Sequence, residues 1–517
     1  MAKYKQPDPE QGQFVVLNFS ELFPEDHPVP RLLETIRSFD LSKFDQSYSN
    51  DSEEGGRPAA PVDRILALIV YALLYGNLSM RALERDIKVR ADLMYLSGGM
   101  QIDHSTLAKF RLRHADAIKD LFTQTLFLGV ETGLIDLDTV SIDSTKIKAS
   151  ANRRDIGTKE ELERRYRHIE EACKKRYQEW ENAESSTEKE LLASKMEKFA
   201  RHKEKLAKGL EFLKDREEKK RIHLTDPDAD WHKDGSNRFI VGYATQNAVD
   251  YKSGMIIYQE VVTAQGDPAF TVDIINSVER LKNEILPEKE GEIKYVLDCG
   301  YASEKNLEEL GERDVYLPDR EFAHKQSGGK IKPEERKDRV KEEAPLVTAN
   351  QEGLLEFIYD REKDAFLCPA KQTLKFIRDR ELQGALYREY RFNHCTGCSF
   401  QNQCAGPGNN RKHLLIAKRQ FPNIDVRKLQ HYHGKKGMAS VSNPLTLKMR
   451  EKLSSAYGKT IYSRRFPSVE GVFGVMKSVR NGWQFFRRTL KKAQVDWAER
   501  CIAHNIAKLI SFRRVNV

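Results

Sequence analysis

The stretch DLDTVSIDSTKIKAS (136–150) decides the fold, because it is the first segment of the chain with the pattern of a β-strand. Val140 and Ile142 alternate with Ser141, which is the two-residue period of a strand. Asp143 follows at a point where the strand would meet solvent. A buried aspartate is costly unless it is paired or binds a metal, although capping of a turn is its commoner role.

The same arrangement recurs downstream, where an apolar strand in EIKYVLDCGYASEKN (292–306) ends in Asp298 and a helix is expected from Ser303. Other strands are predicted in RFIVGYATQNAVD (238–250), GMIIYQEVVTA (254–264) and VYLPDR (315–320). The first two of these form a β-hairpin with a turn at Lys252-Ser253-Gly254. A helix is predicted through Ile274, Ile275, Val278 and Leu281. The pattern indicates an α/β fold with two aspartates at strand ends.

A third carboxylate, Glu470, lies in YSRRFPSVEGVFGVMK (462–477), at the predicted start of a helix in a strongly basic part of the chain. From residue 405 onward there are 24 Lys+Arg against five Asp+Glu, whereas the whole chain has a net charge of only +9. Such a local excess is typical of binding to a polyanion. Glu470 and Lys477 share one helix face. They are either a surface pair or a metal-binding carboxylate and a lysine that faces DNA.

Short helices precede the first strand, in residues 56–130. Ile65, Leu68, Ile69, Ala72 and Leu73 form one apolar stripe, and Gly76-Asn77 ends that helix. A second helix is expected through Met80, Leu83 and Ile87, and a third from a cap at Asp103-His104-Ser105-Thr106. The pattern fits a helix-turn-helix-like bundle that binds DNA, or a helical packing domain.

Two insertions interrupt the predicted strands. Residues 157–221 have apolar stripes in two halves, separated by a capping-box pattern at Thr187 and Glu190, and predict two antiparallel helices. Their dense charge indicates a solvated face, with a partner or DNA contact as the alternative. Farther on, Cys368, Cys395, Cys398 and Cys404 have the spacing C-x26-C-x2-C-x5-C, which favours structural zinc over reduced core thiols. His394 and His413 are possible substitute ligands.

Composition excludes several classes of protein. The longest apolar run, residues 65–75, is too short to span a bilayer, and the N-terminus lacks an apolar signal region, so we expect a cytoplasmic, nucleoid-associated protein. The YGKT of residues 457–460 lacks the first glycine of a phosphate loop. The serine-hydrolase pattern G-x-S-x-G and the zinc-protease pattern H-E-x-x-H are both absent.

In their order, IDSTKIKASAN, YATQNAVD, LDCGYASEKN and YSRRFPSVEGVFGVMK resemble the catalytic motifs of bacterial insertion-sequence transposases of the DDE class. RPAAPVDRILALIVYALLYG and DHSTLAKFR resemble the helical N-terminal domain of the same proteins, so the resemblance extends from about residue 56 to 512. It implies a ribonuclease-H-like mixed-sheet core with Asp143, Asp298 and Glu470 as the catalytic triad. Tyr462, Arg465 and Lys477 resemble the residues that accompany the glutamate. Four residues separate Arg465 from Glu470 where the family signature has three, so Arg464 competes with Arg465 for that role.

The resemblance implies two Mg²⁺ or Mn²⁺ ions, with Asp143 bridging both ions and Asp298 and Glu470 each holding one. Such a pair activates the attacking oxygen and stabilises the leaving one. Tyr462, Arg464 or Arg465, and Lys477 would hold DNA phosphates near the cut, although Tyr462 also fits a core position. The expected partners are double-stranded DNA, as terminal inverted repeats and as target, and a second copy of the chain in a homodimer.

We therefore expect a transposase that cuts and rejoins DNA at the ends of its own mobile element. The alternatives are a ribonuclease-H-like nuclease without strand transfer and a non-catalytic DNA-binding relative. The predicted domains are a helical DNA-binding domain at 1–130, the first part of the core at 135–320 with the 157–221 hairpin, a Cys-rich zinc-binding insertion at 321–450, and the C-terminal helical part of the core at 451–517.

Overall fold

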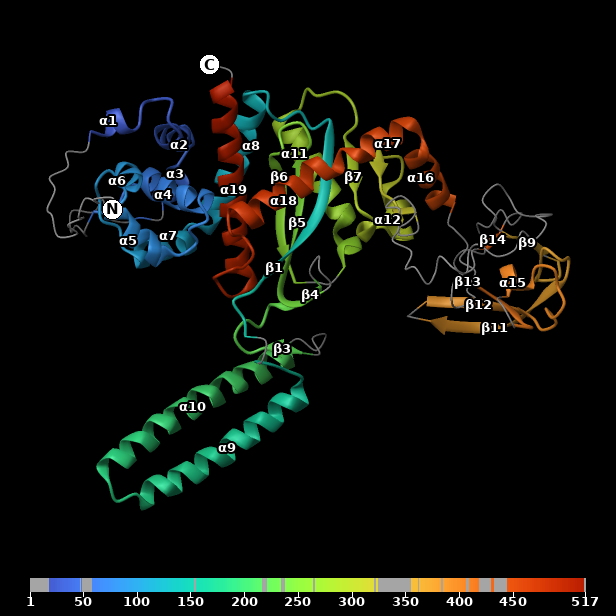
Figure 1. Ribbon diagram of the computed structural model, residues 1–517, viewed down its shortest axis with the longest axis horizontal. Coiled ribbons are helices and arrows are strands. Elements are labelled where there is room, and N and C mark those ends of the chain that lie inside the picture. Colours follow the sequence, from blue (N-terminus) through green and yellow to red (C-terminus); the bar gives the residue numbers. More distant parts are fainter. Residues whose placement is uncertain are drawn as a thin grey trace, which may run out of the picture. The chain divides into compact units, whose positions relative to one another are not determined.

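The segment around Asp143 is β1 (Thr139–Lys148), which lies in the middle of a mixed sheet (Figure 1). On one side β1 pairs antiparallel with β5 (Phe239–Asp250), and on the other it pairs parallel with β7 (Lys294–Leu297). β7 continues in parallel to the short β8 (Val315–Tyr316). The far side of β5 pairs with β4 (Asp230–Lys233) and then with β6 (Ile256–Val262). The predicted strands and the β5–β6 hairpin are confirmed, and the last strand is shorter than expected. The expectation that Asp143 ends its strand is wrong, because β1 continues to Lys148 through its pairing with β5.

The structure is a computed structural model that describes residues 18–46, 48, 58–152, 155–215, 221–233, 238–263, 266–319, 322–323, 355–360, 362–382, 385–405, 409–417, 429–431 and 444–515. The chain divides into two compact units. The first comprises Met1–Tyr301, Glu312–Leu317 and Ala456–Val517, and the second comprises Ala302–Gly311 and Pro318–Ser455. Within the described residues, every helix is too short or too polar to cross a membrane.

The N-terminal part of the first unit is helical, as predicted. Its helices are α1 (Phe19–Leu22), α2 (Pro28–Arg37), α3 (Ser42–Asp45), α4 (Val62–Leu74), α5 (Met80–Ile87), α6 (Ala91–Ser97), α7 (His104–Arg113) and α8 (Ala115–Glu131). Asp103 caps α7 by accepting hydrogen bonds from the backbone N–H groups of Ser105 and Thr106, as its sequence position indicated. Gly98, in the left-handed conformation, separates α6 from α7.

The long C-terminal helix α19 (Leu490–Val515) joins these helices to the sheet, because it packs on α4, α8 and β6. Its buried polar side chains bond to the sheet. Trp497 Nε1 donates to Asn247 Oδ1 on β5, and the Asn505 amide bonds with both the N–H and the C=O of Ile256 on β6. α11 (Thr271–Ile285) also contacts β6 and α8, with Ile274, Ile275 and Val278 buried.

The helical hairpin predicted for residues 157–221 is confirmed by α9 (Lys159–Asn182) and α10 (Ser186–Asp215), which lie beside the two-residue strands β2 (Ile156–Gly157) and β3 (Ile222–His223). Residues 216–220 of the predicted range lie outside the described residues. Leu162, Ile169, Leu206, Leu213 and Ile222 form a core of their own. The capping box predicted at Thr187 and Glu190 is wrong, because α10 already begins at Ser186. The capping box of this hairpin is instead at the start of α9, between Thr158 and Glu161.

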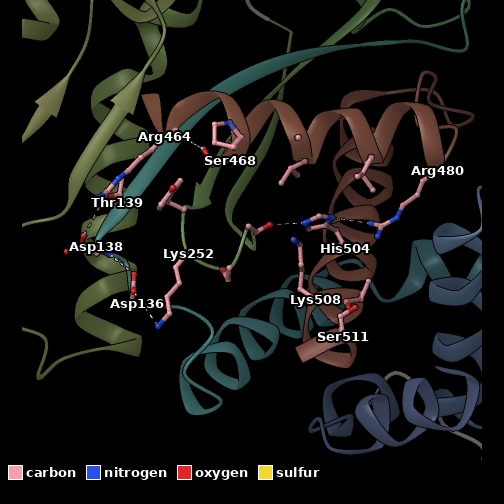
Figure 2. A pocket seen from close by; sticks show the side chains of 18 residues that line it. Asp136, Asp138, Thr139, Lys252, Arg464, Ser468, Arg480, His504, Lys508 and Ser511 are labelled. Atoms are coloured by element: carbon pink, nitrogen blue, oxygen red, sulfur yellow. Dashed lines mark hydrogen bonds and ion pairs between the residues drawn. The ribbon is translucent and has the colours of Figure 1, made fainter. Parts of the chain in front are cut away.

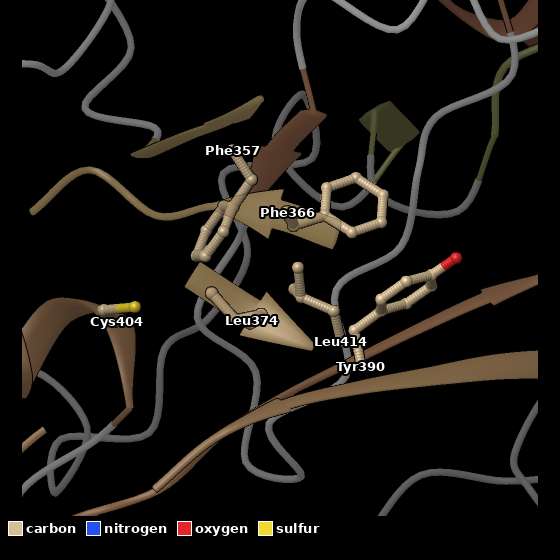
Figure 3. Packing of buried hydrophobic residues seen from close by; sticks show 6 residues of the cluster. All are labelled: Phe357, Phe366, Leu374, Tyr390, Cys404 and Leu414. Atoms are coloured by element: carbon tan, nitrogen blue, oxygen red, sulfur yellow. The ribbon is translucent and has the colours of Figure 1, made fainter. Parts of the chain in front are cut away.

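The second unit contains an antiparallel sheet in the order β13-β12-β11-β10-β9-β14. Its strands are β9 (Leu355–Asp360), β10 (Ala365–Leu367), β11 (Thr373–Leu382), β12 (Ala385–Phe392), β13 (Lys412–Ala417) and β14 (Leu429–His431). Phe357, Phe366, Leu374, Tyr390, Cys404 and Leu414 form its buried core (Figure 3). This unit also contains α12 (Glu304–Leu310), the single turn α15 (Gln401–Cys404) and α16 (Pro444–Ser454). Ser303 caps α12, as expected.

The segment with Glu470 follows α17 (Ala456–Ser463) and is helical from Phe466 to Val479. It consists of η4 (Phe466–Glu470), α18 (Gly471–Gly474) and η5 (Val475–Val479), of which η4 and η5 are π-helical turns. We refer to residues 466–479 as the Glu470 helix. Pro467 has no N–H to donate, and this favours a widened turn at its start. Glu470 is therefore at the end of the first turn, not at the helix start that the sequence indicated.

Candidate active site

Asp143 is held in the middle of the sheet by its place on β1. Its backbone pairs with Asn247 of β5, and its carboxyl group is buried with 9% of the residue exposed. Oδ1 accepts a hydrogen bond from the N–H of Ser144 at 2.7 Å, which leaves Oδ2 for contacts outside the strand. Burial raises the pKa of this carboxyl to about 7 against the opposing effect of Arg465, and nearby Asp298 adds to the rise.

Asp298 lies beside Asp143 because β1 and β7 are neighbouring parallel strands. Ile142 pairs with Leu297, so the next residue of each strand is one of the two aspartates. Oδ1 of Asp298 accepts a hydrogen bond from the N–H of Gly300 at 2.7 Å. A Cβ at residue 300 would lie only 2.8 Å from this oxygen, so the glycine allows the tight turn. Both aspartates thus have one oxygen bonded to backbone and the other available.

The Glu470 helix is fixed to β1 by a hydroxyl contact. Ser468 Oγ is 2.6 Å from Ser141 Oγ, and Ser468 is buried. Ser141 is two residues before Asp143 on the strand. This contact sets the position of Glu470, which is two residues after Ser468 and has a side chain 41% exposed.

The three carboxylates meet at one guanidinium group. Arg465 Nη2 is 2.6 Å from Asp143 Oδ2 and 3.8 Å from Asp298 Oδ2, and Nη1 is 3.1 Å from Glu470 Oε1. The arginine side chain is 15% exposed. These carboxylates come from positions 143, 298 and 470, so only the tertiary structure brings them together. Their available oxygens face a common positive charge.

Of the other predicted DNA-binding residues, Tyr462 is near the carboxylates, whereas Arg464 and Lys477 point to other partners. Arg464 points elsewhere, since its Nη1 donates to Thr139 Oγ1 and its guanidinium lies over the Tyr251 ring. The structure thus places Arg465, and not Arg464, at the carboxylates. Burial raises the pKa of half-buried Tyr462 to about 12, with Arg465 opposing and Asp298 adding to the rise, so Tyr462 is near the cluster. Lys477 Nζ lies 5.4 Å from the centre of the Trp483 ring, farther along the Glu470 helix.

Four residues near the cluster were missed by the sequence analysis. Asp267 Oδ1 accepts hydrogen bonds from Lys146 Nζ at 3.2 Å and Gln246 Nε2 at 2.9 Å, and Tyr301 OH donates to Gln246 Oε1. Burial raises the pKa of Tyr301 as it does that of Asp143, and the charge of Asp267 adds to both increases. Lys146 follows Asp143 by three residues in β1, and because residues three apart in a strand point to opposite faces, this spacing gave no signal. Nothing local marks Asp267, because only the fold brings residue 267 next to β1.

Oxygen atoms alone make up the donor set of the triad, as Mg²⁺ and Mn²⁺ prefer. In the described ranges, however, no three His, Cys, Asp or Glu side chains surround a common metal position. The triad oxygens instead share Arg465.

The four predicted zinc ligands line one cavity of ≈ 30 Å³ in the second unit, together with His394. This volume has room for a single small ion or water. Burial raises the pKa of Cys395, and it raises that of Cys404 to about 12, with the other thiols adding to the rise. Lys412 Nζ donates to the Cys404 carbonyl beside them. His413 lies away from this cavity, since its Nδ1 is 2.9 Å from Glu389 Oε1.

Comparison with known protein families gives two matches. The model of a transposase DDE domain matches residues 367–510, and that of a transposase domain (DUF772) matches residues 17–113. Two separate segments of the chain are thus similar to transposase families, and together they support an insertion-sequence transposase of the DDE class. No curated protein and no solved structure matches the chain. The DDE-domain match includes Glu470 and the four cysteines, whereas Asp143 and Asp298 precede it, so their assignment depends on the geometry at Arg465.

Proposed function

We propose that this transposase cleaves DNA at the terminal inverted repeats of its own insertion sequence and transfers the freed strand to a target. The observation that carries the proposal is the meeting of Asp143, Asp298 and Glu470 around Arg465. Three acids from two adjacent strands and one helix, set in a chain with a basic C-terminal part, fit metal-dependent chemistry on a polyanion.

The order of strands supports a ribonuclease-H-like core. β6, β5 and β1 form an antiparallel meander, and β7 and β8 extend the other side of β1 in parallel. Asp143 in the central strand and Asp298 after its parallel neighbour are then adjacent by topology. The third acid, Glu470, comes from a helix much later in the sequence that packs against β1.

Asp143, Asp298 and Glu470 would hold two divalent ions, Mg²⁺ or Mn²⁺. Bound there, such ions lower the pKa of a water or a 3′-hydroxyl and stabilise the leaving oxygen. The protein's own side chains position the DNA. The Tyr462 hydroxyl remains protonated at neutral pH and can donate to a phosphate oxygen. Arg465 supplies a fixed positive charge that balances the carboxylates, and it can bind a phosphate through two N–H groups.

Asp143→Asn, Asp298→Asn and Glu470→Gln should each abolish Mg²⁺-dependent strand cleavage and leave DNA affinity within about twofold, because each removes one acid from the cluster without removing a DNA contact. A labelled element end mixed with target DNA measures cleavage and strand transfer in one assay. Glu284→Gln is the control, since Glu284 is exposed near the end of α11 in the same unit and lies outside the carboxylate cluster. Substantial cutting by any of the three variants would exclude that residue from the triad.

The same assay separates the alternative functions. A nuclease without strand transfer would cut the labelled end and give no joined product. A non-catalytic relative would bind the end and give neither product. Only the appearance of joined product with the wild-type protein supports transposase activity.

The domain assignment is part of the proposal. Residues 1–130 would recognise the element ends, 135–320 and 451–517 would form the catalytic core, and 321–450 would be the zinc-binding insertion. Joining two DNA ends calls for a homodimer. Lys477 and Arg464 would contact DNA outside the carboxylate cluster, since both lie on or beside the Glu470 helix and away from its acids.

We also propose that Cys368, Cys395, Cys398 and Cys404 bind one structural Zn²⁺. Support comes from the four thiols around a single small cavity and from Lys412 beside them. Burial lowers the pKa of Lys412 to about 8, with the charges of Cys404 and Cys395 opposing this effect. Four thiolates on zinc would carry a net charge of −2, which this lysine would partly balance.

Purified protein should contain about one Zn per chain, measured by elemental analysis under reducing, chelator-free conditions. Changing both Cys395 and Cys398 to Ser should remove the metal and lower the melting temperature. Cys173→Ser in the helical hairpin is the control and should leave the zinc content unchanged. Wild-type protein without zinc would refute the assignment.

A further inference from the structure

A cleft of ≈ 980 Å³ lies along a second face of the Glu470 helix, entirely within the first unit (Figure 2). Arg464, Ser468, Gly471 and Val475 line it at intervals of three or four residues, which is one side of a helix. Glu470 is outside that series, and its carboxylate contacts Arg465 beside Asp143 and Asp298. The Glu470 helix therefore borders the candidate active site with one face and this cleft with another.

The charges of the cleft are arranged asymmetrically. At the β1 end, Asp136 and Asp138 are matched by basic side chains, with Lys252 at 3.5 Å from Asp136 and Arg464 at 4.0 Å from Asp138. At the α19 end stand Arg480 and Lys508, and no ion pair joins either to a carboxylate among the described residues. Two cations without an acid at one end of a cleft form a site for an anion.

Burial disfavours the charged forms of Arg480 and Lys508 in the protein without a bound anion. Burial lowers the pKa of Arg480 to about 10, and burial together with Arg480 lowers the pKa of Lys508. His504 lies between them and is neutral, because burial lowers its pKa to about 3. Its Nε2–H donates to the Gly254 carbonyl at 2.8 Å, so Nδ1 accepts the hydrogen bond from Arg480 Nη1 at 3.2 Å. The imidazole thus orients Arg480 without neutralising it.

The β5–β6 turn lies against Lys508 and leaves room for its side chain. Gly254, in the β5–β6 turn, has a φ of +67°, and a Cβ there would lie 3.0 Å from Lys508 Nζ. The turn is rigid, because Asp250 Oδ2 accepts hydrogen bonds from both the N–H and the hydroxyl of Ser253. The lysine is therefore in a preformed position and does not need to be ordered by a ligand.

We propose that this cleft binds phosphates of the DNA backbone beside the cleavage site, with Lys508 and Arg480 as the anion-binding groups. The proposal rests on the proposed function, which brings DNA to the other face of the same helix. Ser468 and Val475 are two turns apart, about 10 Å along a helix, which equals the axial rise of roughly three nucleotides of duplex DNA. A strand held at the carboxylates can thus extend along the cleft.

The test is DNA binding by the full-length protein at several salt concentrations, with a fluorescent random-sequence duplex as the probe. Lys508→Gln and Arg480→Gln should each weaken binding roughly fivefold to tenfold at about 0.1 M salt and reduce the slope of log K against log salt by about one. Lys492→Gln is the matched control, because this lysine is exposed on the far side of the same helix. Wild-type affinity and slope in both cleft variants would overturn the proposal.

A second measurement separates ligand binding from a structural role. Removing a half-buried cation that faces another cation should raise the melting temperature of Lys508→Gln, or leave it unchanged, while DNA binding falls. A lower melting temperature together with unchanged DNA affinity would show that the lysine is structural and would refute the proposal. Tripolyphosphate serves as the free-phosphate probe. If it stabilises the wild type but not Lys508→Gln, and DNA affinity is the same in both, the cleft takes free phosphate and the DNA assignment is wrong.

Failure of this proposal is distinguishable from failure of the proposed function. Wild-type protein that cuts and joins DNA, alongside cleft variants that bind DNA normally, would refute only the cleft assignment. Wild-type protein without Mg²⁺-dependent chemistry would refute the proposed function, whereas a salt slope that falls in both cleft variants would still support the phosphate site.

Discussion

At the scale of single residues, Arg465 determines the electrostatics of the candidate active site. Its guanidinium contacts all three carboxylates, and only 15% of the side chain is exposed. The neighbouring Arg464 has the same chemistry but points to Thr139. Arg464 and Arg465 are thus adjacent in the chain, yet Arg465 balances the charge of the carboxylates while Arg464 lines the cleft. This difference gives a direct test with a matched pair of arginines.

Arg465→Ala should lower the melting temperature without metal, because three neighbouring carboxylates lose the cation they share. Mg²⁺ should then raise the melting temperature of this variant more than that of the wild type, since metal and arginine compete for the same oxygens. Thermal melts with and without Mg²⁺ measure both effects. Arg464→Ala should respond to Mg²⁺ as the wild type does. Equal Mg²⁺ responses in all three proteins would contradict a metal role for the triad.

At the scale of elements, the hairpin of α9 and α10 has a hydrophobic core of its own. Leu206 is fully buried in that core and packs with residues of α9 and β3, whereas Leu191 on the same helix is 57% exposed. The hairpin should therefore open as a local unit, without the central sheet.

Leu206→Ala should destabilise this hairpin by about 2–5 kcal/mol, because it removes buried methyl groups and leaves a cavity. Amide hydrogen exchange should become faster in α9 and α10 and remain unchanged in β1. Leu191→Ala is the control, and its exchange should match that of the wild type. Faster exchange across β1 in the Leu206 variant would mean that the hairpin and the sheet unfold together.

At the scale of the first unit, a buried ion-pair network joins the N-terminal helices to α19. Arg111 of α7 bonds to both Asp496 and Glu499, and Arg500 also bonds to Asp496 at 3.0 Å. Side chains of the Arg111 pairs are about 5% exposed. Removal of one partner from such a network leaves buried charge behind, and that costs more than the pair contributes.

Arg111→Met should therefore destabilise the protein by about 3–5 kcal/mol and lower the melting temperature of the C-terminal helix together with that of α7. Chemical denaturation followed by circular dichroism measures the loss. Lys109→Met, on the exposed side of α7, should change stability little. If Arg111→Met is as stable as the wild type, the N-terminal helices and α19 are not coupled through this network.

The sequence by itself determined the elements that carry local signals. Alternation of Val140 and Ile142 around Ser141 marked β1, Asp103 marked the start of α7, and apolar stripes marked the helical hairpin. These signals are local because period, capping and turn chemistry depend only on neighbours in the chain. Resemblance to a family added Asp143, Asp298 and Glu470 as candidates, and it left Arg464 and Arg465 in competition.

Only the tertiary structure decided which side chains meet. It put Arg465 and not Arg464 among the acids, brought Asp267 beside them, and grouped Arg480 with Lys508 at one end of a cleft. It also moved the start of the Glu470 helix upstream of Glu470. The physical reason is that contacts between distant residues depend on strand order, helix rotation and burial, and none of these is encoded by the spacing of residues along the chain.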